Sequence, residues 1–106
     1  MLEKRLAQAQ IASGAQTTLY TAATTAIFKT LIITNTTDSE TTVSIWDVKN
    51  GETYGDNNAI VKDLRIPANE FVQITTYLIQ DTAGDTLQAE AGATASITIN
   101  AYGAEI

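Results

Sequence analysis

The residue types on which many enzymes and metal sites depend are missing from this chain. Its 106 residues include no histidine and no cysteine. The usual general base near neutral pH, the thiolate nucleophile and the commonest ligand of transition metals are therefore absent. We expect no disulfide, no zinc site and no cofactor, and we predict that the chain is not an enzyme.

Oxygen-bearing side chains gather at two places, which are the candidates for a metal site. Asp56, Asn57 and Asn58 are consecutive, and Asp81 lies four residues before Asp85. A calcium loop needs several oxygen ligands at tight, regular spacing, and neither segment has it. A glycosidase needs two carboxylates that face each other across a cleft, and a chain of this size has little room for one. We predict solvated turns here and no metal site.

Four aromatic residues, Trp46, Tyr54, Tyr77 and Tyr102, could form a platform that stacks on sugar rings. Such a platform needs flat apolar faces that lie beside polar groups. These four residues are scattered without a shared spacing, so packing in a core or an interface is the preferred interpretation. The segment from Trp46 to Tyr54 stays open as a contact tip.

Short β-strands must position these side chains. Threonine is frequent and often paired, as at Thr24-Thr25 and Thr41-Thr42, and β-branched residues favour strands. Apolar and polar residues alternate between turn signals, and no segment has the length and period of an amphipathic helix. The expected strands span residues 5–12, 16–22, 26–35, 41–49, 58–66, 70–79, 85–91 and 95–104.

Some strands carry more specific signals. Residues 26–34 are apolar on both faces apart from Lys29 and Thr30, which indicates a central strand or one whose outer face meets a partner. Ile60, Leu64 and Ile66 are expected to share one face of their strand. The alternation slips at Trp46, which a bulge would allow.

The turns between strands are also readable. Asn50-Gly51 favours a two-residue type I′ hairpin, in which both central residues need positive φ. Pro67 favours a tight turn because its ring presets φ. Asn35-Thr36-Thr37 matches a glycosylation sequon, a pattern that is short enough to occur by chance.

These features predict an all-β fold, a single antiparallel β-sandwich of jelly-roll or immunoglobulin-like type with seven to eight strands. Residues 1–12 fit an N-terminal arm held by a neighbour, or a first strand. Residues 13–106 are expected to form the sandwich domain.

The charge balance argues against two classes of partner. The chain carries 12 acidic and 6 basic residues, a formal net charge of −6. That balance disfavours binding to nucleic acid or to an anionic membrane. The longest apolar run, Leu31-Ile32-Ile33, is far too short for a membrane span, and no apolar block follows the charged start as it does in a signal peptide.

Five short motifs follow one another along the chain. Residues 5–10 read RLAQAQ, residues 18–21 read TLYT and residues 25–29 read TAIFK. A strand then ends at Asn35-Thr36, and residues 101–106 read AYGAEI. In order and spacing these motifs resemble a group of small structural proteins of tailed-phage virions. The group has a proline where this chain has Ala-Ala after TLYT, so we expect that loop to differ in shape from the group's.

The resemblance implies a virion structural protein that binds other virion proteins. Many members of the group resemble capsid decoration or cement proteins, which implies a trimer on the capsid exterior, bound to the major capsid protein. Others look like neck, tail or fibre accessories. A carbohydrate-binding module that contacts the host is a third interpretation, with Trp46 and Tyr54 at its tip. The candidate partner contacts are Leu2, Arg5, Leu6, Ile11, Phe28, Ile32, Trp46 and Tyr54.

Overall fold

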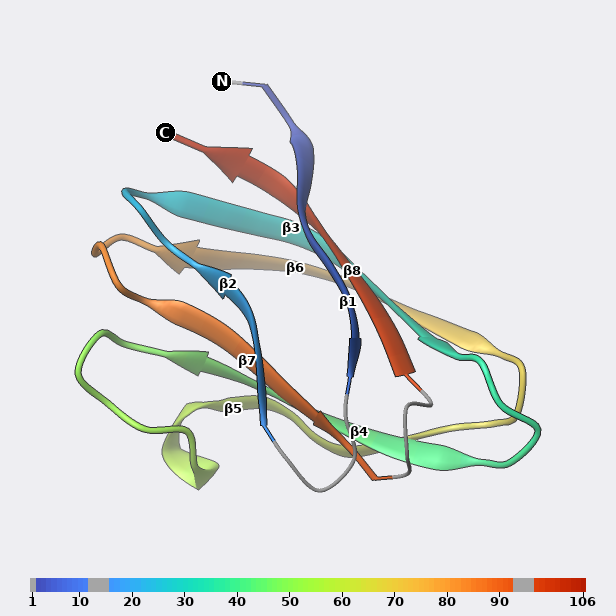
Figure 1. The fold of residues 1–106 in the computed structure, drawn as a ribbon. Helices are drawn as coiled ribbons and strands as arrows, with labels where there is room; N and C mark the ends of the chain where they lie inside the picture. The colour runs from blue at the N-terminus through green and yellow to red at the C-terminus, as the bar shows by residue number, and fades with distance from the viewer. Residues whose placement is uncertain (1, 12–15, 93–96) are drawn as a thin grey trace.

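The part of the chain that the structure describes folds into eight antiparallel strands and one short 3₁₀ turn (Figure 1). A computed structural model describes residues 2–11, 16–92 and 97–106. The expected strand ends at residues 12, 95 and 96 lie outside that part of the chain. The elements are β1 (Lys4–Ile11), β2 (Thr17–Thr21), β3 (Ala26–Asn35), β4 (Thr41–Val48), η1 (Asp56–Asn58), β5 (Ala59–Ile66), β6 (Phe71–Gln80), β7 (Thr86–Ala91) and β8 (Ile97–Glu105).

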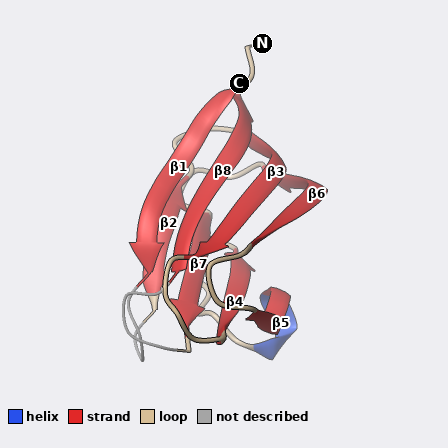
Figure 2. Ribbon diagram, turned by 90° about the vertical axis from the view of Figure 1, so that its right-hand side faces the viewer, coloured by secondary structure: helices blue, strands red, loops and turns tan. Residues whose placement is uncertain are grey.

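The strands form two four-stranded sheets with interleaved order. The first sheet has the order β1-β8-β3-β6, and the second has the order β2-β7-β4-β5. Figure 2 shows the first sheet, with its four strands side by side in this order. An eight-stranded double sheet in which the chain crosses between sheets in this way is a jelly roll. An immunoglobulin-like sandwich groups its strands differently, so the order of strands decides between the two expected types.

The N-terminal segment is a strand within the first sheet. β1 pairs antiparallel with β8 from Lys4 opposite Gly103 to Ile11 opposite Ile97, with one bulge after Arg5. The alternative of an arm held by a neighbour is therefore wrong for Lys4–Ile11. The first and last strands are therefore adjacent in the sheet, and the two chain ends lie near one another (Figure 1).

The core lies between the two sheets and is purely aliphatic and aromatic in its centre. β3, the central strand predicted for residues 26–34, supplies Phe28, Leu31 and Ile33, all without exposed surface. Ile97 and Ile99 of the neighbouring strand β8 lie beside them, and the second sheet adds residues from β4 and β7. Burial of one such side chain stabilises the fold by about 1.5–3 kcal/mol relative to leaving it in water.

A bulge in β5 changes which residues of that strand face the core. Asp63 has φ of 49°, and the pairing of β4 with β5 shifts register between Val43 and Ile45. Val61 and Leu64 therefore pack against the core, whereas Ile60 is exposed. The prediction that Ile60 shares the face of Leu64 and Ile66 is wrong, because the extra residue inverts the alternation.

The bulge expected in β4 at Trp46 lies instead in the neighbouring strand β5. β4 pairs with β7 in unbroken register from Val43 to Val48. The two register shifts occur only where β4 meets β5, and β5 contributes the extra residues there. The sequence of β4 alone does not show whether β4 or the strand paired with it contains the extra residues.

The connection between β4 and β5 is also longer than a two-residue hairpin. Gly51 has positive φ of 88°, but Asn50 does not, so the expected type I′ turn is absent. The Glu52 N–H instead donates to the Lys49 carbonyl at 2.9 Å. This is a turn with glycine in its third position, followed by η1 before β5 begins.

Candidate functional site

The residues predicted to contact partners divide into exposed and buried groups. Leu2 is 87% exposed, Arg5 and Tyr54 are exposed, and Leu6 and Ile32 are half-buried. Ile11, Phe28 and Trp46 are buried within the chain. The prediction that these three side chains contact partners is wrong, since each is already covered by its own fold.

Phe28 faces inward because of an irregularity at Lys29. From Phe28 to Thr30, β3 advances two residues while β8 advances one, from Gly103 to Tyr102. The extra residue reverses the alternation, so Phe28 points into the core and Ile32 points outward. Phe28 packs edge-on against the Tyr20 ring, with the ring centroids 5.2 Å apart.

The outer face of the first sheet is broad and nearly free of charge. One row across it runs from Gln8 through Asn100 and Ile32 to Gln73. The side-chain N–H group of Gln8 donates to the side-chain oxygen of Asn100 at 2.7 Å. A parallel row runs through Thr98, Thr34 and neighbouring residues. Amides and hydroxyls make up the middle of this surface, Arg5 lies at its β1 edge, and exposed apolar residues lie along its β6 edge.

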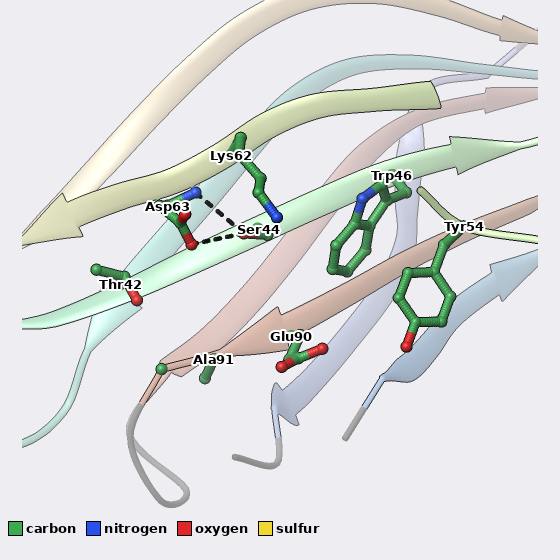
Figure 3. A pocket seen from close by; sticks show the side chains of 9 residues that line it. Thr42, Ser44, Trp46, Tyr54, Lys62, Asp63, Glu90 and Ala91 are labelled. Atoms are coloured by element: carbon green, nitrogen blue, oxygen red, sulfur yellow. Dashed lines mark hydrogen bonds between the residues drawn. The ribbon is translucent and has the colours of Figure 1, made fainter. Parts of the chain in front are cut away.

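The outer face of the second sheet differs in charge and shape. It holds a shallow cavity of about 170 Å³ next to Trp46 and Tyr54 (Figure 3). Lys62, Asp63 and Glu90 bring charges of both signs to its wall. The Ser44 hydroxyl accepts the Asp63 N–H at 3.0 Å and so closes the β5 bulge.

Trp46 has no ring face available for stacking on a sugar. It is 4% exposed, and the Tyr54 ring lies against it with centroids 4.6 Å apart and an angle of 51° between planes. In the described part of the chain the indole N–H meets no acceptor. Tyr54 alone is exposed, so the aromatic tip predicted for this segment is one tyrosine that covers a tryptophan.

A polar cluster joins both ends of the chain to β2. Glu105 accepts a hydrogen bond from the Tyr20 hydroxyl at 2.5 Å and pairs with the Lys4 ammonium at 2.6 Å. The hydrogen bond with Lys4, followed by that with Tyr20, holds the pKa of Glu105 below its usual range. Burial, and then the adjacent Glu105 carboxylate, raise the pKa of the Tyr20 phenol. These groups hold the sheets together at that end.

The two oxygen-rich segments are structural. Asn58 ends η1, where its amide accepts the Gly55 N–H and donates to the Thr53 carbonyl, both at 3.0 Å. Asp85 is only 5% exposed and accepts backbone N–H groups from Asn50 at 2.9 Å and Thr82 at 3.2 Å. The prediction of a solvated turn is therefore wrong for Asp85.

Within residues 2–11, 16–92 and 97–106, no group of three or more acidic side chains is placed to hold a metal ion. No helix among these residues could span a membrane.

Three exposed apolar residues on β6 were not among the predicted contacts. Phe71, Tyr77 and Ile79 are 63%, 65% and 50% exposed. The alternation in this strand correctly places Phe71 and Tyr77 opposite the core-facing Val72 and Ile74. The alternation of apolar and polar residues does not reveal that β6 is the edge strand of its sheet.

The fold is similar to that of a chain in a viral particle. No protein-family model and no curated protein sequence matches the chain. Among solved structures, a chain from the crystal structure of the T13 particle of infectious bursal disease virus matches with a TM-score of 0.50 and 11% identity. A structure of the Gx strain of that virus matches with a TM-score of 0.47 and 14% identity. The matches cover 98% and 99% of this chain but only 31% and 36% of the viral chains, so this chain spans about a third of their length.

Proposed function

We propose that this protein is a structural component of a virus particle and that it acts through surfaces that meet other chains. The supporting observation is the jelly-roll strand order, β1-β8-β3-β6 against β2-β7-β4-β5. Jelly rolls occur in viral capsids, in lectins and in cupins. The similarity in fold to a chain of a viral particle favours the first of these.

The outer face of the β1-β8-β3-β6 sheet is the surface best suited to contact a shell. The centres of interfaces are depleted in charged residues, because a charge that loses water needs a partner. This face offers Ile32, threonines and amides, whereas the opposite sheet presents Lys62, Asp63 and Glu90. The overall charge of −6 would also keep the protein away from packaged nucleic acid.

Within that function, our specific proposal is a decoration protein of a tailed-phage capsid, bound to the major capsid protein on the exterior. This proposal rests on the resemblance carried by RLAQAQ, TLYT and AYGAEI at residues 5–10, 18–21 and 101–106. A decoration protein stabilises a shell by bridging neighbouring subunits. Apolar surface buried in such a contact contributes about 25 cal/mol per Å².

Particles that lack the protein, and to which the purified chain is added back, test both levels of the proposal. We expect saturable binding at a copy number comparable to that of the shell protein, and a higher temperature of particle disruption. Ile32→Lys, on the proposed contact face, should abolish binding. Thr18→Lys, exposed on the second sheet, is the matched control and should bind as the wild type does.

The outcomes separate the possible roles. A few copies per particle would replace decoration by a neck or tail position and leave the structural function standing. Absence of the chain from purified particles would refute the structural function itself.

A further inference from the structure

The edge formed by β6 lacks the charges and the short length that protect the other three edges. Strands at sheet edges expose unpaired N–H and C=O groups, and charges, short length or bulges normally keep them from pairing. β1 carries Lys4 and Arg5, β5 carries Lys62, Asp63 and Arg65, and β2 has only five residues and a bulge. β6 has ten residues from Phe71 to Gln80, with neither charge nor proline.

Side chains of β6 are exposed on the outer face of the sheet and half-buried on its inner face. Phe71, Tyr77 and Ile79 project from the outer face, each at least half exposed. On the inner face, Val72 and Leu78 pack against the core yet stay half-buried. The register of β6 against β3 shifts near Thr30, but the alternation of exposed and covered residues along β6 is unbroken. The strand is the edge of its sheet (Figure 2), although it contributes one more residue than β3 between Leu78 and Thr75.

We propose that β6 pairs antiparallel with β6 of a second copy of this chain, about a two-fold axis at Thr75, so that two four-stranded sheets become one of eight strands. This inference concerns the chain by itself and does not depend on the proposed function. A self-complementary strand is what a two-fold contact needs, because the same patch serves both partners.

The residues of β6 match one another in this register. With Thr75 opposite its own copy, Phe71 lies opposite Ile79, and Gln73 lies opposite Tyr77. Aromatic residues paired with β-branched ones, and threonine paired with threonine, are favourable cross-strand neighbours. Tyr77 also lies diagonally across from Phe71, so each half of the contact gathers three apolar side chains that are exposed in the single chain.

The ends of the strand select this register over its neighbours. Glu70 comes opposite Gln80, and Asp81 comes opposite Asn69, so no two acidic residues face each other. A shift of two residues in one direction puts Phe71 opposite Asp81, and in the other direction puts Ile79 opposite Asn69. A shift of one residue would turn the apolar side chains of the two strands to opposite faces.

Mass in solution tests the pairing directly. Size-exclusion chromatography with light scattering should give twice the chain mass of 11.3 kDa for the wild type. Thr75→Lys places two like charges opposite each other at the axis and should give the single-chain mass. Thr18→Lys makes the same substitution on the exposed edge strand of the other sheet and should leave the dimer intact. Circular dichroism establishes that each variant is folded.

Complementation tests the register. Thr75→Glu should also give a single chain, and an equal mixture of Thr75→Lys with Thr75→Glu should restore the dimer mass, because the new charges face each other.

Several results would overturn the inference. They are a wild type of single-chain or three-chain mass, a folded Thr75→Lys variant that remains dimeric, and folded variants at position 75 that fail to complement.

Discussion

At the scale of single residues, Asn35 shows how one buried amide joins two connections. Its side-chain N–H group donates to the carbonyls of Ser39 at 2.8 Å and Ile66 at 3.0 Å, and its oxygen accepts the Thr37 N–H at 3.0 Å. Asn35 has no exposed surface. The loop after β3 is thereby attached to the end of β5, and the sequon that contains Asn35 has its acceptor nitrogen inside the protein.

Asn35→Ala should lower the free energy of unfolding by about 2–3 kcal/mol, because buried carbonyl and N–H groups lose their partner. Urea denaturation followed by tryptophan fluorescence measures the change. Asn100→Ala is the control, since its side-chain oxygen accepts a hydrogen bond from Gln8 on the outer face, and it should cost about 0.5–1 kcal/mol. Equal losses in the two variants would show that the network around Asn35 contributes nothing specific.

At the scale of elements, irregular pairing decides which side chains are available to partners. The extra residue at Lys29 turns Phe28 inward, and the bulge at Asp63 turns Ile60 outward. Each bulge reverses the alternation for the rest of its strand. Positions that look equivalent in a strand pattern therefore belong to opposite faces.

Phe28→Ala and Ile32→Ala test this reversal on one strand. Phe28 lies in the core, so its truncation should cost about 3–5 kcal/mol of unfolding free energy. Ile32 is half-buried on the outer face and should cost about 1 kcal/mol. Chemical denaturation of both variants measures the difference, with Phe28→Leu available if the alanine variant does not fold. A larger loss at Ile32 than at Phe28 would mean that the assigned faces are reversed.

At the scale of the whole molecule, the jelly roll closes by pairing its first strand with its last. β1 covers β8 along Lys4–Ile11, and Lys4 bonds Glu105 near the other end of the sequence. Without β1, the long strand β8 would become an edge and Ile97 and Ile99 would lose their cover. The N-terminal segment is thus part of the folding unit.

Deletion of residues 2–11 should therefore abolish the cooperative thermal transition or lower its midpoint by more than 10 °C, on the order of what a loss of several kcal/mol produces in a domain of this size. Differential scanning calorimetry provides the measurement. Leu2→Ser changes an exposed residue that precedes β1, and its midpoint should match that of the wild type. An unchanged transition after the deletion would support the detachable arm instead.

The sequence by itself determined where the strands are and, in most of them, which side faces inward. Within the described residues, the expected strands agree with the observed ones to within two residues at either end. Alternation in β8 correctly placed Ile97 and Ile99 in the core, and alternation in β6 correctly separated Val72 from Phe71. These features are local, since they depend on a strand period of two and on the turn residues between strands.

Only the tertiary structure decided the order of the strands and which candidate contact residues are buried or exposed. Phe28 is buried because β3 and β8 differ by one residue in their pairing, and Trp46 is buried because Tyr54 folds over it. β6 is an edge strand because the strand order places it at the end of its sheet, next to β3. Each outcome depends on pairing between segments far apart in the chain, and alternation within one strand carries no information about its neighbours.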